Sequence, residues 1–156
     1  MTGMINARLA TLQLRLPALP IPRGEYDSHI IHGTVAYVSG QVCRDDHDVV
    51  KGPIGDSMSE RTISRAAELC VLRSLSVLHH ALGSLDLVEQ ILFVRGFVFA
   101  PSTFSEHSRI LDPVSRLFLE IFGDRGRHAR SAIGVSSLPS GGLLEIEITA
   151  AVTRHS

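Results

Sequence analysis

The segment from Gln90 to Ala100 constrains the fold of this chain more than any other feature of its sequence. A β-strand presents alternate residues to the two faces of its sheet. Here both sets of alternate positions are mostly apolar: Leu92, Val94 and Val98 in one set, and Phe93, Phe97 and Phe99, with Arg95 among them, in the other. We therefore expect a strand whose sheet is covered on both faces.

Two amphipathic segments are predicted to cover one of these faces. The longer helix runs from about Ser59 to Leu82, and Ser57 and Glu60 have the spacing of a capping box at its start. The second helix is predicted to begin at Asp112–Pro113, with the aspartate as N-cap and the proline in the first turn, and to end at Gly123.

The remaining strands give an α+β plan. A hairpin is predicted from 29–32 and 35–38, and Ser39-Gly40-Gln41 is interpreted as its end. The last two strands are predicted at 130–135 and 143–152. The resulting order is β-β-α-β-α-β-β, a mixed sheet with two helices on one face. Because two helices cover only one face, another subunit is expected to cover the other.

Composition and charge narrow the class of protein. Residues 1–156 are predicted to form one domain, in which residues 1–23 are an N-terminal extension and proline-rich connector. The formal net charge of −1 gives no general attraction to nucleic acid. No apolar run is long enough to span a membrane, and the two cysteines form no disulfide framework. We expect a cytoplasmic protein without nucleic-acid or membrane partners.

Polar side chains in the last two predicted strands are candidate functional groups. Arg130 stands at the start of one strand, and Glu145 lies inside the next. An arginine fork fits a carboxylate, and a glutamate can hold or deprotonate a water molecule. Together they predict a small pocket for a carboxylate-bearing ligand. The same residues also fit an alternative in which Glu145 and Glu147 line a solvent face and Arg130 pairs with one of them.

The histidines are not expected to form a metal site. His79 and His80 are adjacent on a predicted helix, so their side chains point about 100° apart. Cys43 and His47 have an acceptable spacing but lack a second pair of ligands.

A set of short motifs in a fixed order carries a family resemblance over roughly residues 8–153. The motifs are Tyr37–Gln41, Ala81–Asp86, Gly96–Val98, Phe122–Gly123, His128–Val135, Leu138–Pro139 and Glu145–Glu147. With them the chain resembles the RidA/YjgF family, also labelled L-PSP endoribonuclease-like, and in particular its longer branch.

The resemblance implies a chorismate-mutase-like fold assembled as a homotrimer, with pockets in the clefts between subunits. It also implies hydrolysis of reactive enamines and imines (2-imino acids) to 2-keto acids and ammonia, with no metal or organic cofactor. In that family frame Arg130 clamps the substrate carboxylate and Glu145 positions the attacking water.

The resemblance also implies which residues bind substrate. Tyr26 would line the cleft, and Ser39 and Gly40 would form part of its wall. Ala132 stands where active deaminases carry a cysteine, and its backbone could still bind substrate. Asp112 stands near the position of an expected asparagine.

Two hypotheses about function follow. The first is a trimeric enamine/imine deaminase, and the alternative is a non-catalytic trimer that binds a small carboxylate metabolite in the same pocket. Both hypotheses stay open because the chain departs from the pattern of the active deaminases at three positions. These are Ala132, Asp112 and Glu25, the last of which replaces a proline of the family pattern. Ribonuclease activity, suggested by the older family label, fits poorly with the near-neutral charge.

Overall fold

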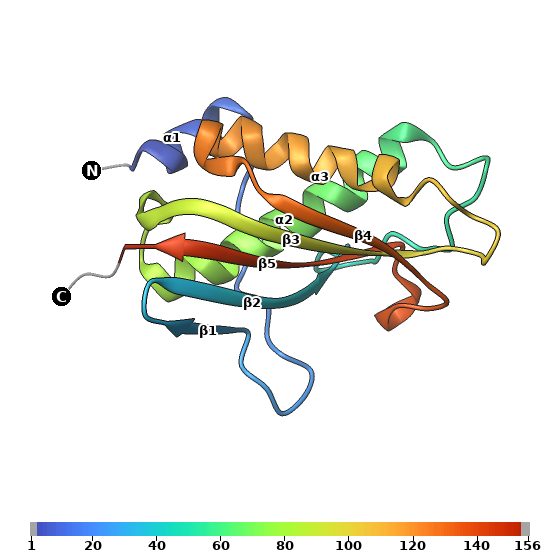
Figure 1. Cartoon of the computed structure of the whole chain (residues 1–156), viewed down its shortest axis with the longest axis horizontal. Helices are drawn as coiled ribbons and strands as arrows, with labels where there is room; N and C mark the ends of the chain where they lie inside the picture. The colour runs from blue at the N-terminus through green and yellow to red at the C-terminus, as the bar shows by residue number, and fades with distance from the viewer. Residues whose placement is uncertain (1–2, 154–156) are drawn as a thin grey trace.

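A five-stranded mixed sheet forms the centre of the molecule (Figure 1). The computed structural model describes residues 3–153. The strands are β1 (His29–His32), β2 (Val35–Val42), β3 (Val88–Phe99), β4 (Ala129–Val135) and β5 (Leu144–Val152). They lie in the order β1-β2-β5-β3-β4, and β3 and β4 are parallel whereas the other neighbours are antiparallel. The predicted α+β order is confirmed, with one short helix added in front.

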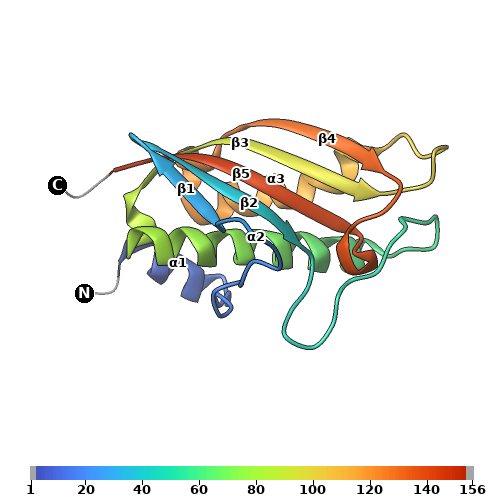
Figure 2. The same ribbon diagram turned by 90° about the horizontal axis from the view of Figure 1, so that it is seen from below.

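Helices α2 (Glu60–Leu82) and α3 (His107–Phe122) lie side by side on one face of the sheet (Figure 2). The other face carries no helix. The added helix, α1 (Met4–Thr11), packs against α3 and the turn at Leu85–Leu87. Its first turn is held by Asp86, whose carboxylate oxygens accept hydrogen bonds from the backbone N–H groups of Met4 (3.0 Å) and Ile5 (2.8 Å).

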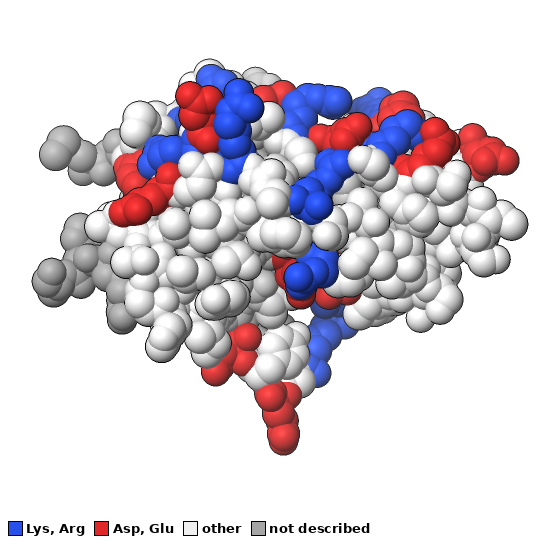
Figure 3. All heavy atoms as spheres, viewed as in Figure 1, with Lys and Arg blue, Asp and Glu red and all other residues white. Residues whose placement is uncertain are grey.

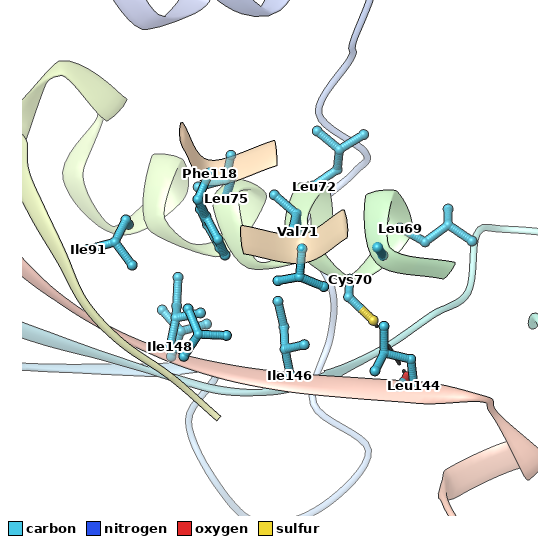
Figure 4. Packing of buried hydrophobic residues seen from close by; sticks show 14 of the residues in the cluster. Leu69, Cys70, Val71, Leu72, Leu75, Ile91, Phe118, Leu144, Ile146 and Ile148 are labelled. Carbon is cyan, nitrogen blue, oxygen red and sulfur yellow. Dashed lines mark hydrogen bonds between the residues drawn. The ribbon is translucent and has the colours of Figure 1, made fainter. Parts of the chain in front are cut away.

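The hydrophobic core lies between the sheet and the two long helices (Figure 4). Cys70, Val71 and Leu75 project from α2 toward Ile146 and Ile148 of β5, and all of these side chains are buried. The period of 3.6 residues on α2 and of two on β5 brings these positions together, as the sequence pattern predicts. Gly83 ends α2 in a left-handed conformation with a φ of 79°.

Helix α2 starts close to the predicted Ser59, but its N-terminal capping differs from the prediction. Ser59 is the N-cap, and its hydroxyl accepts a hydrogen bond from the backbone N–H of Thr62 at 3.1 Å. The predicted capping box of Ser57 with Glu60 is wrong because the helix begins two residues later than that pairing requires.

The start of α3 was predicted wrongly as well. The helix begins at His107, so Asp112 is inside it and Pro113 lies in its second turn. Ile110 and Leu111 are fully buried, and their burial against the core extends the helix before the proline. The proline lacks the N–H that would bond the carbonyl of Arg109, and this single lost bond is tolerated.

The predicted hairpin is formed, but β2 continues to Val42. Its register against β5 shifts between Val38 and Gln41, which marks a β-bulge. Ser39 and Gly40 therefore lie inside the strand at the bulge, and the prediction that they end the strand is wrong. A bulge re-aims the side chains and the backbone around it, often beside a functional site.

The helix-free face of the sheet is the second apolar surface that the sequence predicts. It exposes Ile30 (54%) and Tyr37 (52%), and Phe93 and Phe97 lie half-buried on it. Leu92 was predicted to lie with the buried valines of β3, but it is 39% exposed beside a register shift. In Figure 3 the surface over the strands is mainly uncharged, whereas Lys, Arg, Asp and Glu gather near α3. A subunit covering this face remains a prediction.

Within residues 3–153, none of the helices combines the length and the apolar character that crossing a membrane requires.

Candidate functional site

Glu145 lies on the helix-free face of the sheet. Its neighbours in β5, Leu144 and Ile146, are fully buried against the helices, so strand alternation sends the glutamate to the opposite side. Burial raises the pKa of the Glu145 carboxyl, and the negative charge of Glu147 raises it further, whereas the positive charge of Arg44 opposes both. A carboxylate with a raised pKa is a stronger proton acceptor than an ordinary glutamate.

The backbone of Gly40 lies directly against the Glu145 carboxylate. A Cβ atom at position 40 would be 2.9 Å from Glu145 Cδ, closer than real Cβ atoms come to other heavy atoms. The missing side chain therefore makes room for the carboxylate at the β2 bulge. Ser39, which precedes the glycine, accepts a hydrogen bond on its carbonyl from the Gln41 amide at 3.3 Å.

Tyr26 belongs to the same region. It lies just before β1, is 54% exposed, and lines a small pocket with Ser28, Ser39 and Gly40. The structure thus brings together four of the predicted site residues, Tyr26, Ser39, Gly40 and Glu145, around the bulge in β2.

Arg130 lies elsewhere, between β4 and α3. Its side chain is 18% exposed, and its guanidinium donates hydrogen bonds to Asp112 Oδ1 (3.1 Å) and to the hydroxyls of Ser115 (3.0 Å) and Ser108 (2.7 Å). The Ser108 carbonyl accepts a further bond at 3.2 Å. The alternative in which Arg130 pairs with Glu145 or Glu147 is wrong, because Arg130 pairs with Asp112.

Arg130 and Glu145 project from opposite faces of the sheet. Arg130 is in register with Val94 of β3, and Val94 with Ile148 of β5, a row that is buried under the helices. Glu145 is in register with Phe97, whose side chain belongs to the helix-free face. One chain therefore does not bring the two predicted catalytic side chains into one pocket.

The two other predicted site residues lie with Arg130. Ala132 follows it on the helix side of β4 and packs against the core. Asp112, predicted at the start of a helix, projects from within α3 and holds the arginine fork. An anionic ligand at Arg130 would therefore meet the Asp112 carboxylate.

His128 is a member of this region whose role the sequence did not indicate. The Gly126 carbonyl accepts a hydrogen bond from its Nδ1 at 2.7 Å, so Nδ1 carries the proton. Its Nε2 lies 2.8 Å from the Ser115 hydroxyl, which also accepts from Arg130. Burial lowers the pKa of His128, and the charge of Arg130 lowers it further, against the opposing effect of the Gly126 bond. A neutral histidine therefore closes this hydrogen-bond chain.

Among residues 3–153, no group of three or more histidine, cysteine, aspartate or glutamate side chains is arranged to hold a metal ion.

Comparisons with known proteins agree with this architecture. The model of the YjgF/chorismate mutase-like family, whose description adds a provisional endoribonuclease label, matches residues 6–151. Protein TCP17 of Trypanosoma cruzi is 35% identical over 148 residues, which is 94% of this chain and 92% of that protein.

Two crystal structures share the fold over nearly the whole chain. The protein Atu1372 from Agrobacterium tumefaciens, of unknown function, has 32% identity and a TM-score of 0.86, covering 96% of this chain and 94% of its own. A protein from Shewanella oneidensis MR-1, given a provisional endoribonuclease label, has 28% identity and a TM-score of 0.89, covering 96% and 100%. This chain therefore belongs to the YjgF/chorismate mutase-like family.

Proposed function

We propose that this protein hydrolyses small 2-imino acids to 2-keto acids and ammonia, at pockets formed between the subunits of a homotrimer. The observation that carries the proposal is the Glu145 carboxyl, half-buried against the Gly40 backbone with a raised pKa. A group of this kind can take a proton from a water molecule and return it later in the reaction.

The geometry of a single chain supports the proposal that more than one subunit forms the pocket. Arg130 and Glu145 lie on opposite faces of the sheet, so one copy supplies only half of the predicted pocket. The apolar helix-free face offers a surface on which a second copy would be buried. In the proposed trimer, Arg130 of one protomer approaches Glu145 of its partner, as the family resemblance implies.

The reaction does not require a strong nucleophile from the protein, because the imine carbon is already electrophilic. Glu145 takes a proton from water as the water oxygen bonds to that carbon. Return of that proton to nitrogen completes the carbinolamine. Glu145 then accepts the proton of the new hydroxyl and passes it to nitrogen as the C–N bond breaks, which releases ammonia and leaves the keto acid. Arg130 holds the substrate carboxylate, so the contribution of the site is mainly orientation.

One observation favours the second candidate, a non-catalytic trimer that binds a carboxylate metabolite. Asp112 already neutralises the Arg130 guanidinium at 3.1 Å, and Ala132 supplies no reactive side chain beside it. Substrate must then compete with Asp112 for the arginine fork.

The test is the release of ammonia from 2-iminobutanoate generated in situ. We expect the wild-type protein to accelerate release above the uncatalysed rate, and Glu145→Gln to lower kcat on the order of 100-fold, since a general acid–base group contributes that much or more. Glu89→Gln, which changes an exposed carboxylate at the other end of the sheet, is the matched control. Equal rates with and without wild-type protein would reject the deaminase. Sedimentation of a monomer would reject the shared pocket.

A further inference from the structure

Three arginines from distant parts of the sequence converge beside the Glu145 region. Arg23 ends the proline-rich connector, Arg44 follows β2 by two residues, and Arg73 lies in the middle of α2. All three line the small pocket that also contains Tyr26, Ser39 and Gly40, and no carboxylate lines it. Its cavity volume of about 20 Å³ holds about one water-sized group, so the cavity can admit the end of an oxyanion and not a whole ligand.

The path of the connector is fixed where it passes α2 (Figure 2). The hydroxyl of Ser76, a buried residue of α2, donates a hydrogen bond to the Pro17 carbonyl at 2.8 Å. Prolines at positions 17, 20 and 22 restrict the backbone from this anchor to Arg23. The position of Arg23 near Arg73 is thus set by the fold of the connector.

No carboxylate among residues 3–153 pairs directly with this cluster, although the charge of Asp46 acts on Arg73 and that of Glu145 acts on Arg44 from farther away. Across residues 3–153, none of the three arginines forms an ion pair within 4.0 Å. Arg73 Nε is buried and has no hydrogen-bond partner, and the one contact of Arg44 is with the Ser140 hydroxyl at 3.4 Å. A buried N–H group of a cation without an acceptor is costly, and arginine cannot escape the cost by losing its proton.

The arginines also affect one another. Burial lowers the pKa of Arg73, and the charges of Arg44 and Arg23 lower it further. Burial also lowers the pKa of Arg44, and the charge of Arg23 lowers it further. The charges of Tyr26 and Glu145 oppose this shift. Like charges held together in a partly buried pocket are stabilised when an anion joins them.

We infer that the Arg23–Arg44–Arg73 cluster binds a second oxyanion group, a carboxylate or a phosphate, on the ligand whose reactive carbon lies at Glu145. The inference rests on the proposed function, because it adds a substrate class to the same site. Arg130 takes the carboxylate next to the imine carbon, and the cluster takes the distal anion. The ligand is therefore a dianionic imino acid or its keto product.

The position of the cluster supports this division of roles. Arg44 lies near enough to Glu145 to influence the pKa of its carboxyl, and Gly40 borders both the cluster pocket and the Glu145 carboxylate. A short ligand can therefore reach from the arginines to the glutamate. The hydroxyls of Tyr26 and Ser39 provide further donors to the distal oxyanion.

The test compares the binding of three keto-acid-like probes to the full-length protein by calorimetry. These are 2-oxobutanoate with one anionic group, 2-oxoglutarate with a second carboxylate at its far end, and 3-phosphohydroxypyruvate with a phosphate at its far end. We expect at least one of the two dianions to bind 10-fold or more tightly than 2-oxobutanoate, since charge-assisted hydrogen bonds contribute on that scale. The two dianions identify the distal group as carboxylate or phosphate.

Three single variants, Arg23→Gln, Arg44→Gln and Arg73→Gln, locate the effect. Each is expected to weaken dianion binding about 10-fold while leaving the affinity for 2-oxobutanoate within about twofold. Arg23 is exposed, so its variant tests the cluster even if Arg73→Gln fails to fold. Arg65→Gln is the matched control, because Arg65 is on the same helix but pairs with Glu68 at 2.6 Å and lies outside the pocket.

Equal affinities for the three probes would overturn the inference. So would variants that lose 2-oxobutanoate binding as strongly as they lose dianion binding, because the cluster would then hold the only carboxylate. Its failure is distinct from failure of the proposed function. Hydrolysis of 2-iminobutanoate without any preference for dianions would reject the second oxyanion site alone. Preference for a dianion through these arginines without imine hydrolysis would reject the deaminase alone.

Discussion

Arginines in two regions of this molecule differ in whether their hydrogen-bond donors and charge have partners within the chain. Between β4 and α3, Arg130 donates to an aspartate, two serine hydroxyls and a carbonyl, so its charge and its donors are satisfied within the chain. Beside the β2 bulge, Arg44 and Arg73 form no ion pair with any of residues 3–153, and Arg73 Nε is a buried donor without a partner there. In the first arrangement a ligand must compete with partners inside the chain, whereas the second leaves an arginine donor free for an anion.

The contrast changes how the predicted site is understood. Arg130 is the position at which the family resemblance implies carboxylate binding, yet a ligand there must displace Asp112. The cluster of Arg23, Arg44 and Arg73 has no internal competitor within its pocket. Four variants can break or sharpen this comparison.

The largest effect is expected from Gly40→Ala in the second region. A Cβ atom at this position would lie 2.9 Å from Glu145 Cδ, so the carboxylate must move. Displacement of a reacting group by about 1 Å can cost on the order of 100-fold in kcat/KM, which is the loss we expect in the imine assay. Gly55→Ala is the control, because a Cβ there meets nothing within 4 Å. Activity within threefold of wild type would mean that Glu145 does not act from this position.

Arg130→Ala is expected to lower the free energy of unfolding by about 2 kcal/mol, because it leaves Asp112, Ser108 and Ser115 without their charged donor. Denaturant titration measures the change. The control is Arg116→Ala on the exposed side of α3, the helix that carries the partners of Arg130. It should alter the free energy of unfolding by less than about 0.5 kcal/mol. If the two variants were equally stable, the hydrogen bonds of Arg130 to α3 would not contribute to the stability of the fold.

The sequence predicts most of the framework because each element carries a strong local pattern. The spacing of apolar residues defines α2, and the alternation in β5 correctly places Glu145 and Glu147 on one face. The start of α3 was missed because Asp112–Pro113 has the local form of a helix N-terminus, whereas burial of Ile110 and Leu111 decides the boundary.

The arginine cluster could not be predicted in the same way. Arg23, Arg44 and Arg73 are separated by 21 and 29 residues, and each is unremarkable in its own segment. Their proximity depends on the path of the connector over α2, which the Ser76–Pro17 hydrogen bond fixes. Likewise, Arg130 faces α3 because of the register of β4 with β3. No local sequence pattern predicts this register.

A smaller effect is expected for His128, which completes the Arg130 network in its neutral form. Its pKa is lowered in the folded protein, so below the ordinary value near 6.5 the unfolded chain binds more protons. The stabilisation is present above that value and is lost as the pH falls through it. Unfolding free energies between pH 5 and 8 should therefore decrease toward acid more steeply in wild type than in His128→Asn. Parallel profiles would remove His128 from the network.

The smallest effect on stability is expected for Arg73→Gln in the absence of ligand. The change removes a charge that Arg44 and Arg23 repel, so we expect the free energy of unfolding to change by less than about 0.5 kcal/mol or to increase. Inorganic phosphate at a few millimolar should raise the melting temperature of wild type and of Arg65→Gln, but not that of Arg73→Gln. A loss near that of Arg130→Ala would instead show that Arg73 is a structural residue, and the contrast between the two regions would disappear. If Arg73→Gln left stability unchanged and removed the response to phosphate, arginine would be held by partners within the chain between β4 and α3, and would be free to bind an anion beside the β2 bulge.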